Sequence, residues 1–310
     1  MPAVLEAKNV TKIFGGGFLS REEENVAVNN ISMSLDQKNP KIIAVAGESG
    51  SGKTTLARLL LGIAAPTTGT VEYDGKDLST ISRSERREFR REVQPIFQDP
   101  YGSYNPFYKV DHVLFTPIKN FNMAESRDEA VDMVEKALEL VGLVPAETLG
   151  RLPHQLSGGQ RQRVMVARAL LLKPRVILAD EPVSAVDASL RATILDAVSK
   201  LNKDLGIALV YVTHDLTTAY QISDEIMILY KGNLVEAGDV ETVIKNPKHP
   251  YTQLLIDSIP EADPGKKWGK LDMEKTQNKI LTSPSVGDTE LDCSTDELAA
   301  PPIWKVLIVS

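Results

Sequence analysis

Cysteine is nearly missing from this chain, since Cys293 is the single one among 310 residues. An intrachain disulfide is therefore excluded, and we expect a reducing compartment. Long apolar runs are missing too, because no uncharged stretch approaches the ~18 residues of a membrane-spanning helix. The first residues, MPAVLEAKNV, lack the charged-then-apolar pattern of a signal peptide. These absences predict a soluble intracellular protein and leave docking on a membrane protein open.

A surplus of positive charge is also lacking. Lys and Arg number 35 against 42 Asp and Glu, which gives a formal net charge of −7, whereas a general nucleic-acid binder is usually basic. The Arg-rich stretch SRSERREFRRE, residues 82–92, interleaves its arginines with Glu85, Glu88 and Glu92. This pattern is typical of a solvated helix face with i,i+4 pairs, so no nucleic-acid partner is expected.

Short, continuously apolar runs indicate strands that are covered on both faces. Each such run has a helical pattern near it in the sequence. The apolar runs are 41–47, 175–180 and 207–213, and the helical segments are 53–62, 189–204 and 216–221. Strands that alternate with helices predict a largely parallel sheet in an α/β fold.

The two ends of the chain have different patterns. Residues 3–13 and 26–35 alternate apolar and polar side chains as half-buried strands do, and 15–24 is expected to connect them as a hairpin. From 261 onward the chain is polar and nearly aperiodic, and we expect weak order there until the closing IWKVLIVS, which could pair as a late strand.

The middle of the chain, about residues 100–172, interrupts the alternation of strands and helices. Within it, Ser126 and Glu129 form the sequence pattern of a capping box, followed by apolar residues at helical spacing as far as residue 141. Helical patterns also cover 111–119 and 159–172. The middle is therefore predicted to be a helical insertion in the α/β core.

GESGSGKTT, residues 47–55, matches the pattern G-x-x-x-x-G-K-[ST] between a buried strand and a helix. Glycines at these positions let backbone N–H groups turn inward around phosphate oxygens. Lys53 is expected to reach the β- and γ-phosphates, and Thr54 is expected to bind Mg²⁺. The residues expected to hold the nucleotide here are Gly47, Glu48, Ser49, Gly50, Ser51, Gly52, Lys53, Thr54 and Thr55.

RVILADE, residues 175–181, supplies an acidic element. Asp180 emerges from the sheet near the phosphate loop, where it is expected to hold Mg²⁺. Glu181 is expected to orient an attacking water, because phosphoryl transfer relies on positioning and charge neutralisation. His214 follows another buried strand and could donate to the γ-phosphate, and Gln98 could sense Mg²⁺ or the water. Taken alone, His214 also fits a structural role and Gln98 a turn cap.

HQLSGGQRQRV, residues 154–164, starts a helix in an unusual way. Ser157 suits the N-cap, but Gly158 and Gly159 follow it, and each costs about 1 kcal/mol relative to Ala inside a helix. No acidic residue complements the positive end of the helix. The exposed N–H groups with Ser157 therefore predict a second anion site. Two copies that each close this site on the other's bound nucleotide would be two-fold symmetric.

LSGGQ between a phosphate loop and an acidic strand resembles the nucleotide-binding domain of ATP-binding cassette (ABC) proteins. The resemblance covers about residues 3–258. It implies a P-loop NTPase core with a mainly parallel sheet, an N-terminal antiparallel β-subdomain and an inserted helical subdomain at about 100–172. We accordingly expect a nucleotide-binding domain at 1–258, and a partly linker-like extension at 259–310.

The same resemblance implies roles for single residues. GESGSGKTT corresponds to the Walker A loop that binds ATP and Mg²⁺, Gln98 to the Q-loop glutamine, and LSGGQ, which ends at Gln160, to the signature. Glu181 corresponds to the catalytic carboxylate and His214 to the switch histidine. The resemblance also places Phe14 against the adenine and Asp187, within SAVD, in the D-loop at the nucleotide. These residue types together describe an ATPase.

QPIFQDPYGSYNP (94–106) and NPKHPYTQLLIDSIP (246–260) resemble the oligopeptide/dipeptide importer subfamily. This implies an ATPase subunit at the cytoplasmic face of the membrane that powers import of peptides, with oligosaccharide or nickel import as alternatives. Its implied partners are a second ABC ATPase subunit, identical or homologous, permease subunits and an extracytoplasmic solute-binding protein. HPYTQLL is expected to begin a docked helix without a recognition role.

Two departures and two other classes of protein bear on this interpretation. Val183 and Val186 stand where the subfamily reads EPTSALD, so Val183 lacks the hydroxyl that Thr would offer for a hydrogen bond. One cysteine cannot ligate an iron–sulfur cluster.

A soluble ABC ATPase acting on nucleic acid or ribosomes usually carries a coiled-coil insertion or a second cassette, which this sequence lacks. A GTPase would need N-K-x-D, and NKDL at 202–205 does not match it.

Overall fold

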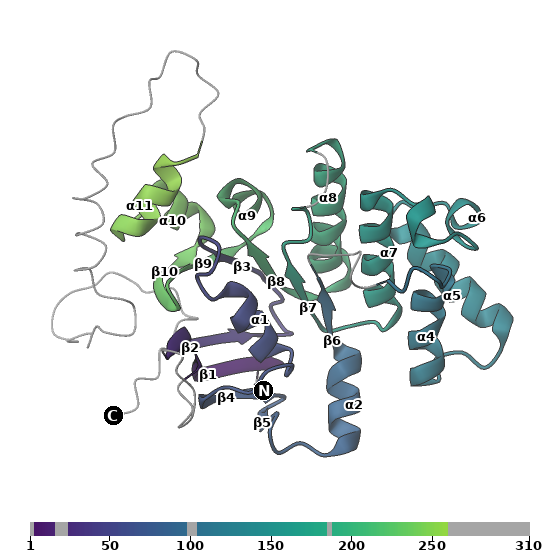
Figure 1. The fold of residues 1–310 in the computed structure, drawn as a ribbon, viewed down its shortest axis with the longest axis horizontal. Helices are drawn as coiled ribbons and strands as arrows, with labels where there is room; N and C mark the ends of the chain where they lie inside the picture. Colours follow the sequence, from purple (N-terminus) through teal and green to yellow (C-terminus); the bar gives the residue numbers. More distant parts are fainter. Residues whose placement is uncertain (1–2, 16–23, 98–103, 185–187, 260–310) are drawn as a thin grey trace, which may run out of the picture.

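Two β-sheets and a helical region make up the computed structural model (Figure 1), which describes residues 3–15, 24–97, 104–184 and 188–259. The hairpin connection between the first two strands lies mostly outside these residues. Gln98, Asp187 and the chain beyond residue 259, including its closing apolar segment, lie outside them entirely. The strands and helices predicted within the described residues are all present.

The larger sheet has six strands in the order β10-β9-β3-β8-β7-β6. All neighbours are parallel except β9 and β10, which form an antiparallel hairpin at one edge. The strands are β3 (Ile42–Ala46), β6 (Val93–Ile96), β7 (Val176–Asp180), β8 (Ala208–Thr213), β9 (Glu225–Tyr230) and β10 (Asn233–Asp239). Every residue of β3 and β8 is buried, which explains their uniformly apolar sequences.

The smaller sheet is antiparallel and covers one side of the first helix. Its strands run in the order β2-β1-β4-β5. They are β1 (Leu5–Phe14), β2 (Asn25–Leu35), β4 (Thr68–Tyr73) and β5 (Lys76–Asp77). Helix α1 (Lys53–Leu60) buries Leu56, Leu59 and Leu60 in one hydrophobic cluster with Leu5 of the small sheet and Val212 of the large one. α1 is therefore held between the two sheets.

The helices of the middle region lie together on one side of the molecule, beyond β6 and β7 (Figure 1). They are α4 (Asp111–Phe121), α5 (Arg127–Leu140), α6 (Pro145–Thr148), a 3₁₀ turn (Pro153–Gln155) and α7 (Gly158–Leu171). Apolar side chains of α4, α5 and α7 share a buried cluster with Ile96 and Ile177 of the sheet. The helical region is thereby packed against the α/β core.

The remaining helices connect the strands or follow the last one. They are α2 (Arg83–Glu92), α8 (Ala188–Leu205), α9 (Leu216–Ile222), α10 (Val240–Lys245) and α11 (Pro250–Asp257). α2 has the predicted solvated character: Phe89 is its one buried side chain, and Ser82 with Glu85 forms a complete capping box. Across the described ranges, no helix combines the length and the apolar character needed to cross a bilayer.

The N-terminus of α11 is fixed by side chains rather than by helix propensity. Glu236 of β10 accepts hydrogen bonds from the backbone N–H groups of Lys248 (2.8 Å) and His249 (3.0 Å). Nδ1 of His249 in turn accepts the N–H of Tyr251 at 3.1 Å, as an N-cap does. Burial lowers the pKa of His249, and the Glu236 carboxylate opposes that shift. A neutral His249 therefore holds this helix end.

The stability of the protein should depend on pH through His249. When the pH lies between the lowered pKa of His249 in the folded state and its ordinary value near 6.5, this side chain is protonated in the unfolded chain but not in the folded one. The free energy of unfolding should therefore fall as the pH drops from about 7.5 to about 5.5. Urea denaturation at both pH values should show a smaller fall for His249→Asn, which keeps an acceptor at the cap. His154→Asn, an exposed control, should retain the wild-type fall, and an unchanged fall in His249→Asn would contradict this role.

Candidate functional site

The predicted phosphate loop leaves β3 and enters α1 through backbone that only glycine fits. Gly47 and Gly52 have φ angles of 150° and 105°. A Cβ at Gly47 would lie 2.2 Å from the carbonyl oxygen of Leu229 in β9, and a Cβ at Gly52 would lie 2.2 Å from that of Ala27 in β2. The loop is therefore wedged between one strand of each sheet.

Lys53 lies at the start of α1 and turns back into the loop. Its Nζ donates to the carbonyl oxygens of Gly47 (2.8 Å) and Glu48 (2.6 Å). Burial lowers the pKa of this ammonium group, whereas Glu181, Asp180 and Glu48 raise it. The ammonium group is thus poised inside the loop, where it can exchange carbonyl oxygens for the oxygens of an anion.

Thr54 and Asp180 face each other across the site from α1 and from the end of β7. Oγ1 of Thr54 donates to Oδ1 of Asp180 at 3.4 Å. Burial raises the pKa of Asp180, and the contact with Thr54 opposes this shift. The parallel register explains the meeting, because Asp180 pairs with Val212 of β8 and Val45 of β3 pairs with the same residue. A hydroxyl and a carboxylate placed this way are hard oxygen ligands, which suit Mg²⁺.

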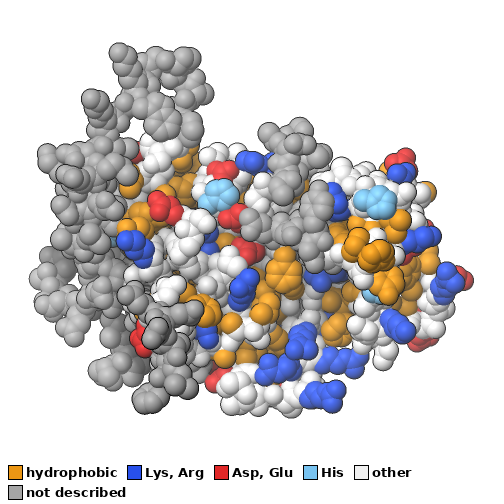
Figure 2. Space-filling view, in the orientation of Figure 1, with side chains coloured by type: hydrophobic (Ala, Val, Ile, Leu, Met, Phe, Trp, Pro, Cys, Tyr) orange, Lys and Arg blue, Asp and Glu red, His pale blue; other side chains and the backbone are white. Residues whose placement is uncertain are grey.

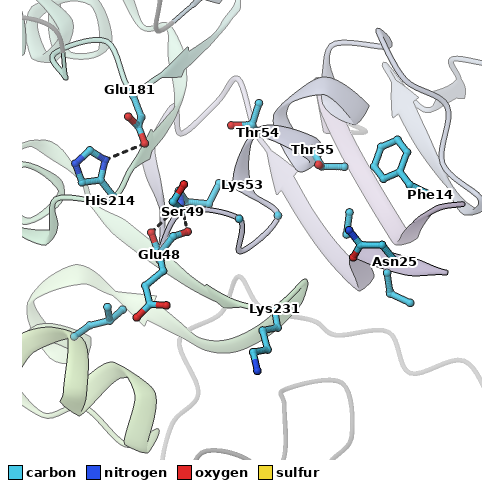
Figure 3. A pocket seen from close by; sticks show the side chains of 16 residues that line it. Phe14, Asn25, Glu48, Ser49, Lys53, Thr54, Thr55, Glu181, His214 and Lys231 are labelled. Atoms are coloured by element: carbon cyan, nitrogen blue, oxygen red, sulfur yellow. Dashed lines mark hydrogen bonds and ion pairs between the residues drawn. The ribbon is translucent and has the colours of Figure 1, made fainter. Parts of the chain in front are cut away.

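Glu181 and His214 form a pair at the ends of neighbouring strands. Nδ1 of His214 lies 2.9 Å from Oε1 of Glu181. Glu181 has φ 46°, a left-handed conformation that is uncommon for a side-chain-bearing residue and is often found at functional sites. Its N–H donates to the carbonyl oxygen of Val212 at 2.9 Å, which holds the strained backbone in place. Figure 3 shows both side chains on the same side of the pocket as Lys53.

The phosphate loop, Glu181 and His214 line one pocket of about 940 Å³. Phe14 at the end of β1 lies at its far side, 47% exposed and with Nζ of Lys12 5.2 Å from its ring centre (Figure 3). The predicted residues that line the pocket are Phe14, Gly47, Glu48, Ser49, Gly50, Gly52, Lys53, Thr54, Thr55, Glu181 and His214. Ser51, also in the loop, is buried and does not line the pocket; its Oγ lies 3.5 Å from Nζ of Lys53. Sequence analysis missed the other residues that line the pocket, which are Asn25, Val26, Ala27, Lys231 and Leu255.

The LSGGQ segment does not line this pocket in the described part of the chain. Ser157 caps α7 by accepting the N–H of Gln160 at 3.2 Å, and Oε1 of Gln160 accepts the N–H of Ser157 at 2.9 Å. This capping box uses neither the N–H of Gly158 nor that of Gly159. Ser157 is exposed, so the helix end faces outward as a second anion site would.

The arginines after LSGGQ have structural contacts. Nη1 of Arg163 donates to the carbonyl oxygen of Gly142 at 2.8 Å, just past the end of α5. The carbonyl oxygen of Arg161 accepts the hydroxyl of Tyr104 at 2.9 Å. The side chain of Arg163 and the backbone of Arg161 therefore help to fix α7 within the helical region.

A phosphate loop with a facing carboxylate pair and a separate glycine-rich helix end agrees with the comparisons with known proteins. The model of a family described as "ABC transporter" matches residues 28–184. The chain belongs to the ABC transporter family. It is accordingly an ATPase with the cassette fold, and residues 235–287 match a second model, "Oligopeptide/dipeptide transporter, C-terminal region".

Individual relatives and structures agree with this assignment. The oligopeptide transport ATP-binding protein OppF of Streptococcus pyogenes serotype M1 is 36% identical over 290 residues, or 93% of this chain and 90% of OppF. The dipeptide transport ATP-binding protein DppF of Escherichia coli K12 is 41% identical over 251 residues, or 80% and 73%. A dimeric post-hydrolysis structure of the ATP-binding cassette MJ0796 with ADP and Pi matches with a TM-score of 0.67 and 30% identity, covering 76% of this chain and 98% of that one.

The close approach of the loop to both sheets can be tested by a matched pair of substitutions. Gly47→Ala places a methyl group against the Leu229 carbonyl and Ser51, so unfolding free energy should fall by roughly 3 kcal/mol or more. Gly50 also has a positive φ, 82° against 150° at Gly47, but a Cβ there meets no atom within 4 Å, so Gly50→Ala should cost only about 1 kcal/mol of backbone strain. Equal losses in urea denaturation would show that steric contact does not fix the loop.

Proposed function

We propose that the chain is the ATP-hydrolysing subunit of a membrane importer of the oligopeptide/dipeptide type. The observation that carries the proposal is the separation of two anion-binding elements in one chain. The pocket around Lys53 covers one side of a triphosphate, and the exposed helix end at Ser157 lies outside that pocket. The C-terminal-region match and the names of OppF and DppF support the transported class.

Each lining residue then has a chemical task. Lys53 leaves the loop carbonyl groups and binds the β- and γ-phosphates, while Phe14 stacks on the adenine. Thr54 and Asp180 hold Mg²⁺, with Gln98 as a further ligand in the proposed site. Bound Mg²⁺ supplies neutralisation of the charge on the phosphate oxygens.

The pair of Glu181 and His214 prepares hydrolysis. Glu181 orients the attacking water and accepts its proton, because its carboxylate already lies in the pocket with a hydrogen-bond partner. His214 is 57% exposed at its side chain, so it is free to turn from Glu181 toward the γ-phosphate. The left-handed backbone at Glu181 directs its carboxylate into the pocket just past the end of β7, out of the sheet.

A second ATPase subunit completes the site. Ser157, Gly158, Gly159 and Gln160 of that subunit, identical or homologous, close over the exposed side of the nucleotide, with Asp187 of the D-loop beside it. The N–H groups of Gly158 and Gly159 are those the capping box does not use, so they can face an oxyanion. The dimeric ADP- and Pi-bound cassette structure supports this arrangement.

The membrane partner should bind a groove of about 1290 Å³ beside α2, α4 and α7. Lys and Arg side chains gather on this edge of the molecule, over α2 (Figure 2). The basic residues that line the groove are Arg58, Arg83, Arg86, Arg87, Arg90 and Arg168. Such a surface fits an acidic cytoplasmic segment of a permease. Thr54 lines both this groove and the nucleotide pocket, so the groove reaches the nucleotide site.

Assembled with permease subunits, the chain is placed at the cytoplasmic face of the membrane, and an extracytoplasmic solute-binding protein delivers the solute. Peptides are the proposed solute, with oligosaccharide or nickel as alternatives that identification of the solute bound by the co-purified complex would decide. Pull-down of nucleic acid or ribosomes in place of a permease would favour the soluble class of ABC ATPase.

Glu181→Gln tests the proposed reaction. The amide cannot accept a proton, so ATP turnover should fall by about 10²–10⁴-fold while ATP remains bound. Trapped ATP should then double the mass seen by light scattering, with the chain alone or with its partner ATPase. In the same background, Lys53→Ala should prevent the increase and Ser157→Ala should weaken it. A Glu181→Gln protein that binds ATP without any gain in mass, alone or with the partner, would contradict the shared site.

Reversal of charge in the groove tests the permease surface. Arg83 and Arg90 are exposed on α2, and Arg83→Glu with Arg90→Glu should repel an acidic segment. Recovery of the permease on the tagged full-length chain should fall at least tenfold. Arg127→Glu on α5, outside the groove, carries the same change of charge per site and should recover the permease as the wild type does. Equal recovery by all three proteins would place the permease elsewhere.

A further inference from the structure

The C-terminal unit formed by β9, β10 and α11 touches the phosphate loop directly. The N–H of Gly232, in the turn between β9 and β10, donates to the carbonyl oxygen of Ser51 at 3.0 Å. The hydroxyl of Tyr251 in α11 accepts the N–H of Glu48, the second residue of the loop, at 3.0 Å. A segment far along the sequence thus holds the loop at two of its peptide groups.

Tyr251 is itself held firmly. Its side chain is 1% exposed, and its ring packs against that of Tyr230 at the end of β9, with centres 4.4 Å apart. Its backbone N–H donates to the capping side chain of His249, and the backbone N–H of His249 in turn donates to Glu236. Burial raises the pKa of Tyr251 to about 12, so the phenol stays neutral at every ordinary pH. The hydroxyl is therefore a rigid and constant partner for the loop.

The backbone of Glu48 is hydrogen-bonded at both its N–H and its carbonyl oxygen, and the two bonds differ in one respect. Its carbonyl oxygen is bonded to Lys53, whose ammonium must leave when it binds a phosphate group. Its N–H is bonded to Tyr251, which does not line the nucleotide pocket and can stay in place when a ligand arrives. The contact with Tyr251 therefore remains to hold this part of the loop after Lys53 has moved.

We propose that Tyr251 is a positioning residue for ATP binding: through its hydroxyl, α11 keeps the first peptide groups of the phosphate loop in the conformation that receives the triphosphate. This rests on the proposed function of the loop. Tyr251 of the expected docked helix at HPYTQLL thus acquires a role in the nucleotide site, acting through Glu48 without lining the pocket itself. The interaction preorganises binding and makes no special contact in the transition state.

Tyr251→Phe in the full-length chain tests the proposal, because it removes only the hydroxyl. The Kd for ATP by calorimetry and the KM for ATP should each rise about fivefold, the scale of one hydrogen bond's net contribution, with kcat unchanged. Tyr73→Phe is the matched control, since that buried hydroxyl donates to Glu92 at 2.6 Å outside the pocket. Both variants should lose similar stability to urea, but Tyr73→Phe should keep the wild-type Kd. Equal Kd values in all three proteins would overturn the proposal.

Hydrogen exchange at the N–H of Glu48 gives a second measurement. The N–H of Glu48 should exchange slowly in the wild type with and without ATP, and faster in Tyr251→Phe. Fast exchange in the wild type would also overturn the proposal. Lys53→Ala separates this result from failure of the proposed function, because ATP binding that survives Lys53→Ala would refute the phosphate loop itself, whereas Tyr251 can fail with the loop intact.

Discussion

Close packing of backbone against backbone at the phosphate loop is the constraint on which the site depends. Gly47 leaves no room for a Cβ beside β9, and Gly52 leaves none beside β2, so one loop is gripped by both sheets. This close packing fixes the start of α1 and therefore the directions in which the side chains of Lys53 and Thr54 point. The parallel register of β7 and β8 then brings Asp180 within hydrogen-bond reach of Thr54.

Charge balance within the site follows from the same packing. Lys53 and Glu181 line the nucleotide pocket, and Asp180 lines the adjoining groove. Burial lowers the pKa of Lys53 and raises that of Asp180. A triphosphate and a divalent cation bring further charges of both signs into this space. In the free protein, Lys53 is bonded to loop carbonyl oxygens and His214 to Glu181. Both hydrogen bonds can be replaced by bonds to phosphate oxygens when a nucleotide binds.

The sequence predicted the parts of the fold whose patterns are local. The runs at β3, β7 and β8 are apolar because both faces are covered, and the capping pattern at Ser126 precedes α5 as expected. The sequence analysis did not predict β4, β9 or β10: the burial of β4 and β10 depends on their neighbours in the sheet, whereas the apolar run of β9 is a local pattern that was missed. The contact between Tyr251 and Glu48 joins positions 203 residues apart, and no local pattern encodes it. Val183 is buried in the core, an environment that suits its apolar side chain.

Thr54 borders two cavities at once, with the nucleotide pocket on one side and the arginine-lined groove on the other. The two occupants would both contact the first turn of α1 at this residue. Energetic communication between them then requires no relay through distant helices. Thermodynamic linkage then makes the effect reciprocal. If bound nucleotide raises the affinity of the groove for its occupant by some factor, the bound occupant raises the affinity for nucleotide by the same factor.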